Sequence, residues 1–257
     1  PQPAFARAAL YPRYTLKLNI QPIEKLDRRD DHSLDVHGAP FYTIQGEGPF
    51  SGHPAVFVRL AGCNLQCPGC DTDYTSTRTR MSPEGIVQEV QRLHPGPRLV
   101  VITGGEPFRQ NIGLLTQLLE DAGYRIQIET NGALPVPDGL APSTVIICSP
   151  KTFRVHPSVV DRAWAWKYVL DANHVDPLDG LPTLALYNNT KGRVARPPRE
   201  FFDVPGMLGA IYVQPMDEGT GFALGAANHQ NMKAVIATCM KHGYTAQQQL
   251  HKNLNLP

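Results

Sequence analysis

The chain has 257 residues and a formal net charge of +1 at pH 7, with 42% hydrophobic and 18% charged residues. This balance is ordinary for a globular protein, and it argues against a protein that coats nucleic acids or membrane surfaces, because such proteins carry a large excess of positive charge. No apolar run approaches the ~18 residues that span a membrane. The length allows one large domain or two small ones, and we expect neither a nucleic-acid nor a membrane partner.

Residues 1–39 are rich in proline and charged residues, so we expect them to form an N-terminal extension. The alternating segment 14-YTLKLNI-20 within them predicts an edge strand. From residue 40 onward the apolar residues recur more regularly, which places a core domain at residues 40–257.

Apolar strands alternate with helices along the core. Ser82 predicts the start of a helix whose apolar positions continue to Leu93, and two more helices are predicted at 111–122 and 223–242. The predicted strands are 55–60, 98–104, 124–130, 144–149, 164–170 and 210–216. Continuous apolar strands separated by helices indicate a parallel sheet with both faces covered.

The fold class predicted from this order is α/β, with about six parallel strands in either a doubly wound sheet or an open, partial barrel. Residues 171–209 hold many prolines and glycines and are predicted to form a long surface connection. In both architectures ligands gather at the carboxyl ends of the strands. Polar segments follow the strands there, at a cysteine loop, Thr103–Pro107, Glu129–Gly132, Ser149–Lys151 and Gln214–Asp217. Lys167 lies inside a strand, where a solvated edge and a role in the site are equally compatible with the sequence.

Three of the five cysteines, Cys63, Cys67 and Cys70, lie within 62-GCNLQCPGCDT-72. An odd number of cysteines at such close spacing favours metal binding over disulfides, and therefore a reducing, cytoplasmic compartment. Cys148 and Cys239 stand apart from the loop and are predicted to be packing thiols.

The three loop cysteines admit two interpretations. One is a zinc site completed by a distant ligand such as His53. The other is a 4Fe–4S cluster held by three thiolates, with one iron left open for a substrate. The missing fourth cysteine favours the cluster, because a catalytic metal site needs an open coordination position.

The pattern C-x3-C-x2-C after a strand, followed by 103-TGGEP-107, resembles the radical S-adenosylmethionine (SAM) superfamily. The resemblance implies a partial, open (β/α) barrel that uses a 4Fe–4S cluster and SAM. It also implies that the open iron binds the methionine part of SAM, and that electron transfer then yields a 5′-deoxyadenosyl radical. The residue before the third cysteine is usually aromatic in this superfamily, whereas here it is Gly69.

A longer stretch, 41-FYTIQGEGPFSGHPAVFVRLAGCNLQCPGCDT-72, resembles the 7-carboxy-7-deazaguanine synthase family. The resemblance covers residues 40–257 apart from the long connection, and we find no counterpart of residues 1–39 in it. It implies a carbon–nitrogen lyase that converts 6-carboxy-5,6,7,8-tetrahydropterin into 7-carboxy-7-deazaguanine with loss of ammonia, in 7-deazapurine (queuosine-type) biosynthesis. It further implies Mg²⁺, a homodimer, and a flavodoxin- or ferredoxin-like electron donor.

The resemblance also assigns site residues. Cys63, Cys67 and Cys70 are the expected cluster ligands and catalytic centre, and Thr72 is the expected Mg²⁺ ligand. The residues expected at SAM are Gly69, Asp71, Gly104, Gly105, Glu106, Glu129, Asn131, Ser149, Pro150, Lys151, Gln214, Pro215, Met216 and Asp217. The residues expected at the pterin are Ile44, Gln45, Gly46, Glu47, Arg59, Thr103 and Pro257.

Chemical reasons accompany some of these assignments. Glu47 can accept hydrogen bonds from the guanidine-like edge of a pterin, and the Arg59 guanidinium suits its carboxylate. Glu106 is expected to support the methionine ammonium. The tail 250-LHKNLNLP-257 is expected to close the substrate site, anchored by Leu250, Leu254 and Leu256, although chain ends are often loose.

Two other functions remain compatible with the sequence. One is a different radical SAM enzyme, such as a glycyl-radical activase, although such an enzyme would not need Arg59. The other is a non-catalytic zinc or electron-transfer module, which would not cleave SAM.

Overall fold

The computed structural model describes residues 19–68, 70, 72–93, 99–185, 193–198, 201, 210–217 and 226–256. Within these residues the strands are β1 (Leu34–Val36), β2 (Phe41–Ile44), β3 (Pro54–Leu60), β4 (Thr79–Met81), β5 (Leu99–Gly104), β6 (Arg125–Thr130), β7 (Val145–Cys148), β8 (Ala163–Leu170), β9 (Ile211–Pro215) and β10 (Thr245–Ala246). The helices are α1 (Pro83–Leu93), α2 (Gly113–Asp121), α3 (Pro157–Val160), α4 (Ala226–His242) and α5 (Leu250–Leu254), with 3-10 turns η1 (Gly48–Phe50) and η2 (Pro107–Arg109).

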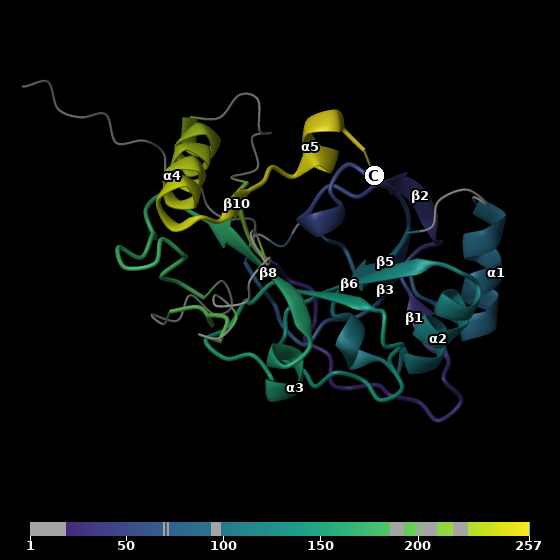
Figure 1. Cartoon of the computed structure of the whole chain (residues 1–257). Helices are drawn as coiled ribbons and strands as arrows, with labels where there is room; N and C mark the ends of the chain where they lie inside the picture. The colour runs from purple at the N-terminus through teal and green to yellow at the C-terminus, as the bar shows by residue number, and fades with distance from the viewer. Residues whose placement is uncertain are drawn as a thin grey trace, which may run out of the picture.

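The described strands join into one open, mostly parallel sheet (Figure 1). Its order is β10-β9-β8-β7-β6-β5-β3-β1-β4, and β2 also pairs with β3. Strands β3 and β5 to β10 run parallel, whereas β1, β2 and β4 pair antiparallel with their neighbours. The six strands predicted from the sequence are β3 and β5 to β9, so the predicted α/β class with a partial, open parallel sheet is confirmed.

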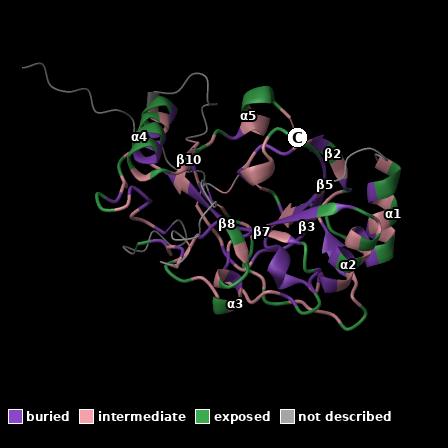
Figure 2. Cartoon of the chain, viewed as in Figure 1, coloured by how far each residue is buried: buried purple, intermediate pink, exposed green. Residues whose placement is uncertain are grey.

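The core lies between the sheet and the helices that pack on it. Side chains on the central strands, such as Val100, Ile102, Ile126 and Ile128, are fully buried in the main core. In β5 the opposite face is buried as well, which makes this strand a continuous apolar run. Figure 2 shows the buried strands between α1 and α2 at one end and α4 at the other, with exposed outer faces on α1 and α4. Helix α4 packs on β8, β9 and β10.

Helix α1 begins as the sequence predicts. The Ser82 hydroxyl accepts a hydrogen bond from the Gly85 backbone N–H at 3.1 Å, and Pro83 occupies the first helical position. A side-chain oxygen at this point satisfies a donor that the helix cannot satisfy itself. The apolar face made by Ile86 and Val90 is thereby turned into the core.

Two segments differ from the sequence-based expectation. Residues 14–18 of the predicted edge strand lie outside the described residues, and the chain from residue 19 on packs against the core instead of projecting as an appendage. Residue Ile23 forms a parallel bridge with Cys63, and β1 is part of the sheet. The connection at 171–209 is not confined to the surface either, because Leu181, Ala185 and Val194 are buried in the main core.

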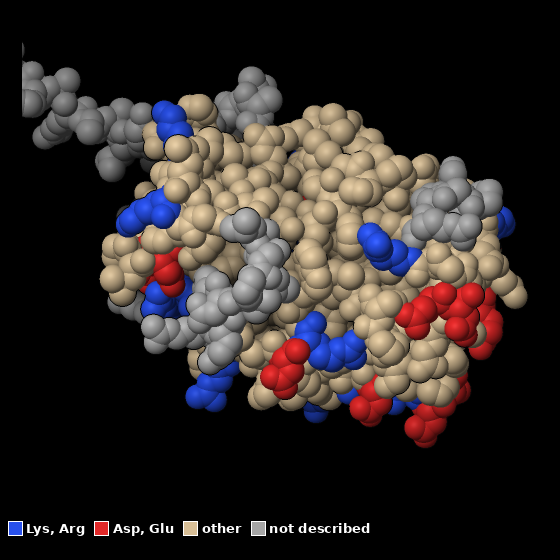
Figure 3. Space-filling view, viewed as in Figure 1, with Lys and Arg blue, Asp and Glu red and all other residues tan. Residues whose placement is uncertain are grey.

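The surface carries charges of both signs. In the face shown in Figure 3, acidic side chains gather over α1 and α2, while Lys and Arg side chains are scattered. Within the described residues, no helix is long and apolar enough to cross a membrane.

Candidate active site

A cavity of about 310 Å³ opens at the carboxyl ends of the parallel strands. Most of the predicted site residues line it: Ile44, Gln45, Gly46, Glu47, Arg59, Cys63, Cys67, Cys70, Thr72, Thr103, Gly104, Gly105, Glu129, Asn131, Ser149, Lys151, Gln214, Met216 and Asp217. Glu106, Pro150 and Pro215 do not line it. Gly69, Asp71 and Pro257 lie outside the described residues. The segments expected at one site therefore meet in one cavity.

The three loop cysteines lie together in the cavity wall, just after β3. None of the three forms a disulfide with another described residue, and Cys67 and Cys70 pack against the small apolar cluster of Cys63, Leu65 and Tyr74. Burial raises the pKa of Cys63 to about 12 and that of Cys67 to about 11. These thiols therefore hold their protons at neutral pH, and metal binding has to release them.

The arrangement suits a cluster better than a single zinc ion. The alternative zinc ligand His53 is exposed, contacts the Phe50 carbonyl oxygen through Nδ1 at 3.0 Å, and does not line the cavity. Among the described residues no group of three or more His, Cys, Asp and Glu side chains is placed to hold one metal ion. In a 4Fe–4S cluster each thiolate binds a different iron, so the thiols do not have to converge on one point.

Two glycines bring the 103-TGGEP-107 turn against the cysteine loop. Gly104 has φ +127°, and a Cβ there would lie 2.1 Å from the Leu60 carbonyl oxygen. A Cβ on Gly105 would lie 2.1 Å from the Gly62 carbonyl oxygen. The Gly105 and Glu106 backbone N–H groups donate to these same two oxygens, each at 3.0 Å. Only glycine permits this close approach of two backbones, which sets the turn beside Cys63.

Glu106 differs in position from what the sequence predicts. Its side chain is fully buried behind the cavity wall, where it accepts hydrogen bonds from Phe108 N at 2.9 Å, Thr130 Oγ1 at 2.7 Å and Asn131 N at 2.7 Å. Burial raises the pKa of this carboxyl group despite these bonds. Glu106 thus joins the turn after β5 to the turn after β6, and its expected contact with the methionine ammonium stays a prediction.

Arg59 and Thr103 are side by side because β3 and β5 pair in parallel at that register. The Arg59 guanidinium lies over the Phe41 ring at 4.8 Å, and Phe41 stacks on Phe57 at 5.4 Å. An aromatic face orients a guanidinium without consuming its N–H donors. Arg59 is therefore held at the cavity, and its contact with the substrate carboxylate stays a prediction.

A buried ion-pair triad forms one wall of the cavity. The Lys167 ammonium contacts Glu47 Oε2 and lies 2.6 Å from Glu129 Oε2, and all three side chains are at most 14% exposed. Burial alone would raise the pKa of Glu47, but Lys167 and the Gln249 amide lower it to about 2. Burial opposes the Lys167 charge as well, yet the two carboxylates raise its pKa overall. Of the two readings of Lys167, the structure therefore supports a place in the site.

Carboxamide side chains surround this triad. Glu47 Oε1 accepts from Gln214 Nε2 at 3.0 Å and from Gln249 Nε2 at 2.7 Å, and Glu129 Oε1 accepts from Gln127 Nε2 at 2.5 Å. Gln214 is 2% exposed, and its Oε1 has no hydrogen-bond partner within the described residues. A buried acceptor without a partner costs free energy, so this oxygen is suited to a donor on a ligand.

The opposite wall comes from the turns after β6 and β7. Asn131 Nδ2 donates to Asn64 Oδ1 at 2.9 Å, which ties this turn to the cysteine loop. The Lys151 ammonium donates to the Ser149 carbonyl oxygen at 2.9 Å and to Ser149 Oγ at 2.5 Å. Burial lowers the pKa of Lys151, because a charged amine is poorly solvated there.

The C-terminal segment covers one side of the cavity. The Gln247 carboxamide bonds both backbone groups of Gly48, at 2.8 and 2.7 Å, and Leu250 N donates to the Gly46 carbonyl oxygen at 3.2 Å. Helix α5 lies beside η1 and β2 in Figure 1. The expected leucine anchor is wrong for Leu254, which is 55% exposed. The side-chain amides of Gln247 and Gln249 attach the segment to Gly48 and Glu47 instead.

Replacing Gly46 with alanine should loosen this cover. A Cβ at Gly46 would lie 2.3 Å from His251 Nδ1 and 2.8 Å from the His251 backbone nitrogen, so α5 must move. We expect a loss of about 1–3 kcal/mol in unfolding free energy, measured by urea titration, together with faster proteolysis of the tail. Gly85→Ala is the matched control, because its Cβ would meet only Ser82 Oγ, at 3.4 Å. Equal behaviour of the two variants would contradict a packed tail.

Several lining residues lie outside the predicted set: Lys167, Gln249, His251, Lys252, Thr130 and Asn19. A lysine inside an apolar strand was a signal for Lys167, since a buried charge needs partners. The glutamines near the C-terminus carry no such signal, because a carboxamide is equally common on a surface.

Comparison with known proteins places these features in a family. The family model for the radical SAM superfamily matches residues 58–145. A curated 7-carboxy-7-deazaguanine synthase of Rhodospirillum rubrum is 41% identical over 91% of this chain and 97% of its own length. One of Rickettsia prowazekii is 32% identical over 88% of the chain and 90% of its own length. The crystal structure of QueE from Escherichia coli superposes with a TM-score of 0.63 at 27% identity, covering 85% of this chain and 95% of that one.

Proposed function

Because the chain belongs to the 7-carboxy-7-deazaguanine synthase family of radical SAM enzymes, we propose that it converts 6-carboxy-5,6,7,8-tetrahydropterin into 7-carboxy-7-deazaguanine and ammonia, for queuosine-type 7-deazapurine biosynthesis. One observation carries the proposal: three thiols, a glycine turn and a polar, charged wall face each other across a single cavity. A glycyl-radical activase would not need the Arg59 guanidinium to bind a substrate carboxylate. A zinc module would not need the Gly104–Gly105 turn beside the cysteine loop.

The residues present fit the family's cofactors. Cys63, Cys67 and Cys70 would hold the 4Fe–4S cluster. The residues expected at SAM, among them Gly104 and Gly105, would bind SAM beside it. When bound, the cluster and SAM supply the 5′-deoxyadenosyl radical that removes hydrogen from the substrate. Cys63 is buried and the turn glycines pack closely on the backbone of Leu60 and Gly62, so this part of the cavity wall is fixed in place. The Thr72 hydroxyl, at the end of the cysteine loop, is our proposed ligand for Mg²⁺.

The other half of the cavity suits the pterin. Arg59 offers a charged fork for the substrate carboxylate, and Thr103 lies next to it on β5. Glu47, which Lys167 keeps ionised despite its burial, accepts hydrogen bonds from the guanidine-like edge. The free Gln214 Oε1 provides a further acceptor. Donors and acceptors on a flat heterocycle thus meet complementary groups on the protein.

Further parts of the proposal come from the family alone. They are a homodimer and a flavodoxin- or ferredoxin-like electron donor. The odd number of closely spaced cysteines supports the proposed reducing, cytoplasmic setting. We also propose that Gly69, Asp71 and Pro257, which lie outside the described residues, contribute to the SAM and substrate sites.

Anaerobic turnover tests the function directly. The protein, reconstituted with iron and sulfide, is incubated with the carboxypterin, SAM, Mg²⁺ and a reductant. We expect a product with deazaguanine absorbance, together with ammonia. SAM cleavage without that product would indicate another radical SAM reaction, and a colourless zinc protein would indicate the structural module.

Replacing Arg59 with lysine should weaken substrate binding selectively. A lysine keeps the charge but loses the two parallel N–H donors, and a charge-assisted hydrogen bond contributes about 1.5–3 kcal/mol. We expect carboxypterin affinity to fall about tenfold or more in a binding titration, with SAM affinity unchanged.

Arg125→Lys is the matched control, because Arg125 also lies over a phenylalanine ring, Phe50 at 5.4 Å, and does not line the cavity. Normal carboxypterin binding by the Arg59→Lys protein would assign Arg59 a structural role only.

A further inference from the structure

The segment 19–28, here called the N-terminal strap, runs beside the cysteine loop. Its residue Gln21 makes a two-sided contact with the backbone that follows Cys70. Gln21 Nε2 donates to the Thr72 carbonyl oxygen at 2.9 Å, and Gln21 Oε1 accepts from Tyr74 N at 2.8 Å. Thr75 Oγ1 donates to the same Oε1 at 3.1 Å. One side chain thus spans four consecutive residues of the loop's end.

Other strap residues hold the start and middle of the loop. Ile23 bridges Cys63 in parallel, and Glu24 N donates to the Cys63 carbonyl oxygen at 2.7 Å. Asn19 Nδ2 donates to the Cys67 carbonyl oxygen at 3.2 Å, and Gln66 Nε2 donates back to the Gln21 carbonyl oxygen at 2.7 Å. The strap therefore contacts the loop next to each predicted cluster ligand.

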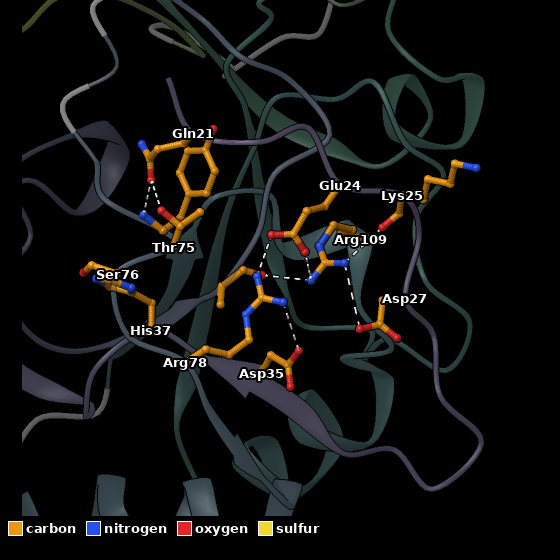
Figure 4. A network of polar contacts seen from close by, with 12 residues as sticks. Gln21, Glu24, Lys25, Asp27, Asp35, His37, Thr75, Ser76, Arg78 and Arg109 are labelled. Atoms are coloured by element: carbon orange, nitrogen blue, oxygen red, sulfur yellow. Dashed lines mark hydrogen bonds and ion pairs between the residues drawn. The ribbon is translucent and has the colours of Figure 1, made fainter. Parts of the chain in front are cut away.

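The far end of the strap is held to the core by an ion pair and hydrogen bonds of Arg109 (Figure 4). Arg109, whose side chain is 3% exposed, lies 3.4 Å from Glu24 and donates to the Lys25 carbonyl oxygen at 3.0 Å. Asp27 N donates to the Arg109 carbonyl oxygen at 2.8 Å. Arg109 ends η2, directly after the Gly104–Gly105 turn. The strap thus connects the cysteine loop to the turn on which SAM is proposed to bind.

We propose that the N-terminal strap sets the position of the cysteine loop and that Gln21 is its main positioning residue. The loop needs such support because it has little regular structure of its own: between residues 64 and 78 the described residues form no helix or strand. A Thr72 carbonyl held by Gln21 also lies 3.7 Å from the Cys70 thiol, so the clamp acts within reach of a ligand. A clamp on backbone groups fixes the directions of the three thiols without touching the cluster. The inference rests on the proposed cluster.

The test compares Gln21→Ala with Gln117→Ala, a matched control that removes a glutamine bond to the Gly139 carbonyl oxygen far from the site. Each apo-protein is unfolded in urea, and each reconstituted protein is followed by iron release to a chelator. The reduced cluster is also examined by electron paramagnetic resonance with and without SAM. We expect Gln21→Ala to release iron about tenfold faster than Gln117→Ala, as expected for the loss of one to two net hydrogen bonds. The urea titration shows that both apo-proteins are folded under the conditions of the iron-release assay. The electron paramagnetic resonance signal of the reduced cluster in Gln21→Ala should be broader than that of the control, and the addition of SAM should change this signal less.

Conservative variants keep the proposal testable if Gln21→Ala does not fold. Gln21→Glu keeps the acceptor for Tyr74 N but cannot donate to Thr72, and Asn19→Ala removes one bond to Cys67. Both should release iron at intermediate rates. Iron release within about twofold of the control, with an unchanged signal, would overturn the clamp. A wild-type protein that takes up no cluster would instead overturn the proposed function, so the two failures are distinct.

Discussion

In the Cys67→Ala protein we expect no 4Fe–4S cluster and no cleavage of SAM. Cys67 lines the cavity between Cys63 and Cys70, and each thiolate is proposed to bind one iron. Without Cys67 only two of the four irons would keep a protein ligand, and no other cysteine among the described residues lies at the cavity. The expected effect is therefore complete loss. Iron and sulfide analysis, resonance spectroscopy of the reduced protein and the yield of 5′-deoxyadenosine measure it.

Cys148→Ala is the control for this experiment. Cys148 is fully buried in the main core and does not line the cavity, so its thiol is not placed to bind the cluster. Its replacement should cost stability through a small cavity but leave the cluster intact. An intact cluster in Cys67→Ala would contradict the assignment. Loss of the cluster in Cys148→Ala with normal folding would mean that Cys148 also contributes to cluster binding.

The main strands were predictable because their core-facing side chains are fully buried and because, in β5, the side chains on the opposite face are buried too. A strand such as β5, with Val100, Val101 and Ile102 all fully buried, leaves an unbroken apolar run in the sequence. Strands β1, β2 and β4 were not predicted, since they are three or four residues long and lie where the sheet turns antiparallel. So short a segment shows no period that separates it from a loop.

The site was predictable where chemistry requires one residue type at one spacing. Three cysteines and two adjacent glycines are such patterns, and both line the cavity. The orientation of Glu106 was not predictable, because the same sequence position can turn its carboxylate to the cavity or to the next turn. The N-terminal strap was missed for a related reason. Its contacts join side chains such as Gln21 to backbone groups 51 residues away, and they leave no periodic pattern in the sequence.

The second large effect is expected from Lys167→Met. Methionine roughly keeps the length of the side chain but removes the ammonium, leaving Glu47 and Glu129 buried beside each other without a counter-charge. Removing one partner of a buried ion pair typically costs about 3–5 kcal/mol, much more than an exposed pair contributes. We expect a loss of this size in the unfolding free energy of the apo-protein at pH 7, measured by urea titration.

The matched control is Lys241→Met on α4. Among the described residues, the Lys241 Nζ makes only a long, exposed contact of 3.5 Å, with the Pro177 carbonyl oxygen. The substitution should change the unfolding free energy by less than about 0.5 kcal/mol. Equal stability of the two variants at pH 7 would show that the carboxylates do not depend on Lys167. The triad would then owe its stability to the surrounding amides.

The pH dependence separates lost charge from lost packing. In the wild-type protein the Glu47 pKa is lowered from 4.5 to about 2, so its ionised form stabilises the fold above about pH 4.5, and this contribution is lost as the pH falls through 2. Without Lys167, burial becomes the dominant influence and raises the pKa of Glu47, so the variant is penalised at neutral pH and relieved as the carboxylate takes up a proton. The stability difference between wild type and Lys167→Met should therefore be largest near pH 7 and shrink steadily toward pH 3. A difference that stayed constant with pH would identify the loss as packing, and it would remove the reason to regard Glu47 as an acceptor that Lys167 keeps charged.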